Sequence, residues 1–142
     1  MKKKILAAVA VVALFLSGCS TVMQYTDDVV LYGNIWKLEK LNGAPVTKPA
    51  TGSDVTFGIV AGLNNIAGSG SCNQYFGSAK VSGSKISFSD IGSTKMACDD
   101  MNLEISYFQK LREVDSFGVS TGKLIFYSGG KAILEFSVLQ KK

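Results

Sequence analysis

The chain has 142 residues, 46% of them hydrophobic, with 15 Lys or Arg against 11 Asp or Glu, and it contains no histidine. This length suits one ordinary domain with an apolar core. Histidine is the commonest general base and a common zinc ligand, so its absence excludes Cys/His metal sites and the usual serine or cysteine triads.

Residues 1–18 have the order of a secretory signal peptide. Lys2–Lys4 are basic, Ile5–Phe15 are all apolar, and small residues then lead to Cys19. The apolar run is shorter than the roughly 20 residues that a membrane-spanning helix needs. We therefore expect this segment to be cleaved rather than to span the membrane.

The segment Leu16–Cys19 resembles the lipobox of bacterial lipoproteins. This resemblance implies cleavage before Cys19, a diacylglyceryl thioether on its sulfur and acylation of its new amine. Several acyl chains hold a protein stably on a membrane, whereas one binds only marginally. Ser20 stands where many inner-membrane lipoproteins have Asp, so we expect an outer-membrane anchor with the domain facing the periplasm. The alternative is an ordinary cysteine near a cleavage site.

The net charge of +4 comes largely from this predicted leader. Loss of residues 1–18 would remove Lys2, Lys3 and Lys4 from the 15 basic residues, which leaves 12 beside 11 acidic ones. The mature domain is then almost neutral and has no cluster of Lys and Arg with interleaved aromatic residues. Nucleic acid is therefore excluded as a partner.

After a polar and acidic tether at residues 19–32, alternating apolar and polar residues predict a strand-rich domain over 33–142. The first strand, Ile35–Leu41, ends at an Asn-Gly turn signal, and the clearest alternation is at Lys85–Ile91. The side chains expected to face inward from that second segment are Ile86, Phe88 and, after a local irregularity, Ile91. Further strands are predicted at 55–59, 78–81, 116–120, 123–127 and 132–138.

One convincing helix is predicted, over Met101–Val114. Leu103, Tyr107 and Leu111 recur at the spacing i, i+4, i+8 and so share one face. We interpret this helix as the cover of the sheet rather than as a segment that fills a partner's groove.

The carboxylates of Asp99, Asp100 and Glu104 form a cluster at the start of this helix. A weak calcium site is one interpretation. Helix capping by Asp99 or Asp100 explains the first two without a ligand and is the interpretation that we prefer. We expect no metal ion and no cofactor.

Cys72 and Cys98 remain as an even pair if lipid occupies Cys19. In an oxidising compartment such a pair predicts a disulfide. The alternative is two reduced, buried cysteines that pack as small apolar residues. Their spacing is not Cys-x-x-Cys, which argues against a thiol redox enzyme.

Three motifs, in this order along the chain, resemble those of the META domain family, also called HslJ-like. The family has a Trp and a Leu in the first strand before an Asn-Gly turn, a Gly-Cys-Asn-x-Tyr-x-Gly centre, and a Ser/Thr-x-Met-Ala-Cys segment before a helix. The matching residues are Trp36, Leu38, Asn42, Gly43, Cys72, Asn73, Tyr75, Gly77, Thr94, Lys95, Met96, Ala97, Cys98, Glu104, Phe108 and Leu111. Ser71 departs from the pattern because it replaces the first glycine of the centre.

This resemblance implies an α+β fold, in which a strongly curled antiparallel sheet of about 6–8 strands packs around a single α-helix. It also implies a bacterial lipoprotein associated with heat shock and envelope stress. No enzymatic activity is established for the family.

We interpret the family motif as a folding motif rather than an active site. Trp36 is expected to anchor the core rather than to serve as a platform for a ligand. Asn73 should form a turn and Tyr75 should pack on the helix with its hydroxyl bonded, although a surface recognition loop is the alternative. Met96 and Ala97 are expected beside Cys98 in the core.

The sequence thus predicts a monomeric, non-catalytic binding or structural module with a possible protein partner in the envelope. The runner-up is a lipid-anchored inhibitor of a periplasmic hydrolase such as a lysozyme or a protease.

Overall fold

A computed structural model describes residues 31–60, 62–120 and 122–141 of the chain. The predicted signal peptide, Cys19 and almost all of the predicted tether lie outside the described residues. Within them the chain forms nine strands and one helix. In chain order the elements are β1 (Asn34–Leu41), β2 (Ala44–Pro45), β3 (Thr56–Val60), β4 (Asn65–Ser69), β5 (Gln74–Ser82), β6 (Lys85–Ser93), α2 (Asn102–Glu113), β7 (Ser116–Ser120), β8 (Lys123–Ser128) and β9 (Lys131–Lys141).

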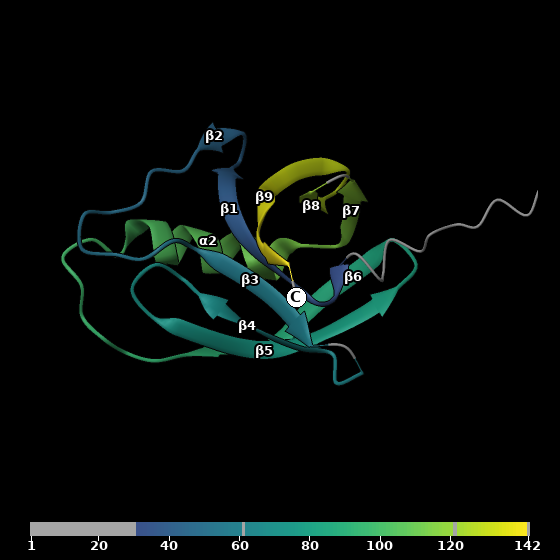
Figure 1. Cartoon of the computed structure of the whole chain (residues 1–142), viewed down its shortest axis with the longest axis horizontal. Helices are drawn as coiled ribbons and strands as arrows, with labels where there is room; N and C mark the ends of the chain where they lie inside the picture. The colour runs from purple at the N-terminus through teal and green to yellow at the C-terminus, as the bar shows by residue number, and fades with distance from the viewer. Residues whose placement is uncertain (1–30, 61, 121, 142) are drawn as a thin grey trace, which may run out of the picture.

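The strands form one antiparallel sheet in the order β2-β1-β3-β4-β5-β6-β7-β8-β9. β1 also pairs with β9, so the sheet curls back on itself, and these two strands lie side by side in Figure 1. β6 and β7 are joined at a single register pair, Lys85 with Ser116. The chain leaves the sheet between these two strands to form α2, which lies behind β1 and β3 in the view of Figure 1.

The predicted fold class, a curled antiparallel sheet with a single helix, is confirmed for the described residues. The strand count is nine, slightly above the expected range. One extra strand is β2, which has only two residues. Another is β4, whose glycine-containing sequence has low strand propensity but is held between β3 and β5, because pairing and packing outweigh intrinsic preference in sheets.

The core lies between the inner face of the curled sheet and α2. Tyr107 and Leu111, which the helical periodicity placed on one face, are both completely buried, and Leu103 packs at the edge of the core. Trp36 is also completely buried, and its Nε1 donates a hydrogen bond to the carbonyl of Leu31 at 3.3 Å. The prediction that Trp36 anchors the core is therefore confirmed.

The expected irregularity in β6 is a β-bulge at Asp90. This residue has a φ of 53°, and the β5–β6 register shifts by one residue at this point. Because β6 has one extra residue at the bulge, the side chain of Ile91 faces the core, as those of Ile86 and Phe88 do. Ile86 is buried, and Phe88 and Ile91 pack partly buried against the core, as predicted.

The start of α2 is close to the prediction. The N-cap position is Met101, which makes no side-chain capping bond, whereas Asp100 Oδ1 accepts the N–H of Asn102 at 2.9 Å. Of the two candidate capping residues, Asp100 therefore satisfies one of the free N–H groups of the first turn.

Candidate functional site

The family motifs meet at the carboxylate of Glu104, a residue of α2 that is only 3% exposed. Its Oε2 accepts the backbone N–H groups of Asn73 at 2.6 Å and Cys72 at 3.1 Å. Its Oε1 accepts the side-chain Nδ2 of Asn73 at 2.7 Å. A buried carboxylate is tolerated when hydrogen bonds replace its lost hydration. Glu104 therefore ties the turn before β5 to the helix.

The side chain of Asn73 extends these bonds to the segment that follows β6. Its Oδ1 accepts the N–H of Met96 at 2.7 Å and the hydroxyl of Thr94 at 2.9 Å, and its Nδ2 also donates to the carbonyl of Met96 at 3.3 Å. With the bond to Glu104, all four hydrogen-bonding positions of the amide are used. Asn73 is 2% exposed, so it is an internal bridge and not part of a surface recognition loop.

Close packing of this region requires glycine at position 70. A Cβ on Gly70 would lie 2.7 Å from Cζ of Phe108 and 2.8 Å from Oε2 of Glu104. The backbone N–H of Gly70 also donates to the carbonyl of Asn73 at 2.7 Å. The helix can therefore approach the turn closely only because this position has no side chain.

A disulfide joins Cys72 to Cys98, with their Cα atoms 6.1 Å apart. The predicted pairing is confirmed, and the alternative of two reduced cysteines does not describe this structure. The bond links the turn before β5 to the segment before α2, which are the same two segments that Asn73 bridges.

The side chains of Met96 and Ala97 contradict the expectation that they pack beside Cys98 in the core, because both residues are exposed. Met96 is 59% exposed, whereas its backbone N–H and carbonyl both bond to Asn73. The motif therefore fixes the main chain at this position and leaves the side chain in solvent. The sequence could not show that only the backbone of Met96 is used, because an apolar residue beside a cysteine is more often buried.

Tyr75 packs on α2 as predicted, and its hydroxyl is bonded. It donates to the carbonyl of Thr56 at 3.0 Å and lies 2.7 Å from the hydroxyl of Tyr107. Because Tyr75 has one hydroxyl hydrogen, Tyr107 must be the donor between the two rings. Burial raises the pKa of both tyrosines above its usual value, and at Tyr75 the neighbouring Tyr107 raises the pKa further.

Ser71 adopts a conformation that favours glycine. Its φ is 104°, in a region where side chains are strained. Its hydroxyl is buried and has no hydrogen-bond partner among the described residues. The departure from the family pattern therefore falls at a residue whose backbone still has the geometry of a glycine.

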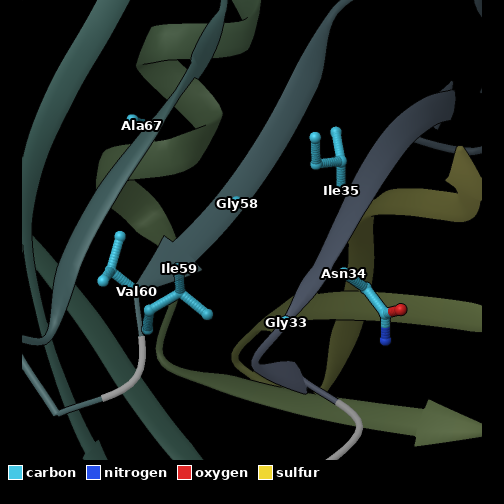
Figure 2. A pocket seen from close by; sticks show the side chains of 7 residues that line it. All are labelled: Gly33, Asn34, Ile35, Gly58, Ile59, Val60 and Ala67. Atoms are coloured by element: carbon cyan, nitrogen blue, oxygen red, sulfur yellow. The ribbon is translucent and has the colours of Figure 1, made fainter. Parts of the chain in front are cut away.

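A separate feature is a hollow of about 360 Å³ on the outer face of the sheet (Figure 2). Ile35, Gly58 and Ala67 lie opposite one another on β1, β3 and β4. The neighbours of Gly58 in the chain, Phe57 and Ile59, are both buried, so this row faces away from the core. The lining residues are Gly33, Asn34, Ile35, Gly58, Ile59, Val60 and Ala67.

Sequence reasoning missed this hollow because it depends on the register of three strands. Each strand taken alone shows an ordinary outward-facing residue at Ile35, Gly58 or Ala67. The one signal available was the single glycine inside the pattern of β3, which is a recognised mark of a bulge or a close backbone approach.

The described residues hold no group of three His, Cys, Asp or Glu side chains that could bind a metal ion. Glu104 turns toward Asn73, so the calcium interpretation loses the third carboxylate of its cluster. In the same part of the chain, no helix has the length and apolar character needed to cross a membrane.

Comparison with known proteins places these observations in a family. The META domain family matches residues 29–141 of the chain. A solution NMR structure of a protein from Burkholderia xenovorans is 24% identical, has a TM-score of 0.64, and aligns over 80% of this chain and 86% of its own. A second NMR structure is 22% identical with a TM-score of 0.61, over 78% of this chain and 92% of its own. Both similarities concern the fold alone. No curated protein matches the chain.

Proposed function

Because this chain belongs to the META domain family, we propose that it is a non-catalytic binding module, held at the periplasmic face of the outer membrane by lipid on Cys19. The anchor is supported by the order of residues 1–19: a basic start, an apolar run and a lipobox. Its target is a protein of the envelope. A role in envelope stress is supported by the family resemblance.

The observation that carries this proposal is the internal use of the family motif. The polar groups that could suggest chemistry, the carboxylate of Glu104 and the amide of Asn73, are buried and bonded to each other and to the backbone. A group that acts on a substrate needs to reach it within hydrogen-bond distance. A motif buried in this way is better suited to holding a binding surface than to catalysis.

The experiment is cell fractionation of the full-length chain with its own leader, compared with Cys19→Ala. We expect the natural protein in the outer-membrane fraction, with an intact mass that lacks residues 1–18 and carries acyl groups. The variant should leave that fraction. A natural protein without acyl mass would contradict the anchor. The non-catalytic assignment would be contradicted if the protein turned over a substrate, and if Glu104→Gln lost this activity while an equally folded control variant kept it.

The alternative, an inhibitor of a periplasmic hydrolase, is favoured by one observation. The segment around Met96 is fixed by Asn73 and by the nearby disulfide, yet it exposes an apolar side chain. Rigid exposed segments bind enzyme clefts with little loss of conformational entropy. Inhibition of a lysozyme or protease panel that is lost in Met96→Asp would support this function, and no inhibition would exclude it.

A further inference from the structure

Gly58, at the floor of the outer hollow, is a glycine that the fold itself does not require. Its φ is not positive, and a Cβ there would meet nothing closer than the carbonyl oxygens of Ala67 at 3.5 Å and Asn34 at 3.9 Å. These are ordinary van der Waals distances. Glycine inside a strand weakens it, because more backbone freedom is lost on folding and no side chain packs. A glycine inside a strand often marks a site where another segment approaches the backbone closely, and the space above Gly58 is the outer hollow.

The surroundings of Gly58 show what chemistry would fit. Figure 2 shows Gly58 on β3, between Ile35 on β1 and Ala67 on β4, with Val60 at the end of β3. Val60 is 49% exposed and Ala67 is also exposed. An apolar side chain placed over Gly58 would remove these apolar surfaces from water, which is favourable in proportion to the area buried.

The chain enters the described structure at the rim of this hollow. Leu31 is completely buried, and its carbonyl is bonded by Trp36, so the entry point is fixed to the core. Gly33, with a φ of 75°, then turns the chain into the rim. Val30 is three positions before Gly33, and each residue spans at most about 3.6 Å. A segment that joins the domain at Leu31 is therefore long enough to reach the hollow without any change in the domain.

The composition of that preceding segment matches the hollow. Residues 20–30 contain two acidic and no basic residues. Their apolar side chains are Val22, Met23, Tyr25, Val29 and Val30. The family match begins at residue 29, so it already includes the last two of these valines.

We propose that residues 20–30 dock into the outer hollow, with one of their apolar side chains seated over Gly58. The occupant is thus the chain's own N-terminal segment, bound within one molecule. One consequence rests on the proposed lipid anchor. Residues 19–30 could span about 40 Å when extended. Docking shortens the distance between the lipid and the domain, and it sets which face of the domain is turned toward the membrane.

The test is limited proteolysis of the exported natural protein. The rate of cleavage at Tyr25 is measured by mass spectrometry of the products. Gly58→Val fills the floor of the hollow and should speed this cleavage about tenfold, because cleavage tracks the undocked population. The matched control is Gly118→Val on β7, where a Cβ would also meet ordinary contacts, the nearest being the Tyr127 ring at 3.6 Å. Its cleavage rate should equal that of the natural protein. Equal rates in all three proteins, each with an unchanged Tm, would overturn the proposal.

A photocrosslinking residue at position 60 provides a second measurement that does not depend on Gly58→Val being folded. We expect links within one chain, to residues 20–30, at a yield independent of protein concentration. Links between two copies, or to lipid in vesicles, would overturn the proposal. Cys19→Ala separates it from the proposed anchor: docking should persist in this variant even though it carries no lipid.

Discussion

Glu104 Oε2 accepts the backbone N–H of Asn73 at 2.6 Å, although the two residues are 31 positions apart. This bond connects α2 to the turn at the start of β5. The disulfide and the Asn73 amide connect the same turn to the segment before the helix. Together these links fix the position of α2 relative to the sheet.

Glu104→Gln should lower the free energy of unfolding by about 2–4 kcal/mol. The variant keeps the shape of the side chain but removes its charge and directs an NH2 group toward N–H donors. Urea denaturation measures the change. The control is Glu113→Gln, whose partner Lys110 lies at 2.7 Å on the helix surface, and which should cost less than about 0.5 kcal/mol. Equal effects in the two variants would show that the buried bonds contribute little.

Ser71→Gly should stabilise the domain by about 1 kcal/mol. Glycine removes the strain of a side chain at a φ of 104° and also removes the unbonded buried hydroxyl. Ser71→Ala is the matched variant, because it removes the hydroxyl and keeps the strain. Thermal or urea unfolding should rank glycine above alanine. The reverse ranking would mean that the strained backbone is not what limits stability here.

Reduction of the disulfide should lower the free energy of unfolding by about 3–4 kcal/mol, as chain-entropy arguments give for a loop of this size. The two cysteines are 26 positions apart. Urea denaturation with and without reductant measures the difference. The double variant Cys72→Ala, Cys98→Ala should unfold at the reduced midpoint and should not respond to reductant. A natural protein that does not respond to reductant either would argue that this bond does not form in solution.

Alkaline pH should destabilise the domain through the pair Tyr75 and Tyr107. Burial raises the pKa of both hydroxyls in the folded state, whereas the unfolded chain titrates near the ordinary value of about 10. Above that pH the unfolded state releases protons that the folded state retains, so stability is constant below it and falls as the pH rises. Urea midpoints between pH 8 and 11 should show this fall, with a shallower slope in Tyr107→Phe. An identical slope in that variant would assign the effect to other groups.

Local patterns in the sequence predicted much of this fold. The phase of α2 followed from Leu103, Tyr107 and Leu111, because helical neighbours four positions apart share a face. The alternation in β6 gave the inward side chains and even the irregularity now located at Asp90. The cysteine count and the expected compartment were enough to predict the disulfide.

Features that depend on contacts between distant residues could not be predicted in the same way. Glu104 had a sufficient local explanation as an acidic residue near a helix N-terminus, so nothing in the sequence pointed to Asn73. Met96 was assigned to the core by its apolar character, although the structure uses only its backbone. The outer hollow arises from the register of three strands, which single-strand alternation does not specify.

Native-state hydrogen exchange of the backbone amides of Asn73 and Met96 tests the central claim most directly. If the family motif is a folding motif, these N–H groups, bonded to Glu104 and to the Asn73 side chain, should exchange only through global unfolding, like the amides of the β1 core strand. Exchange at the rate of an exposed loop would contradict this account, because it would show that the motif opens independently of the fold and is available to bind another molecule.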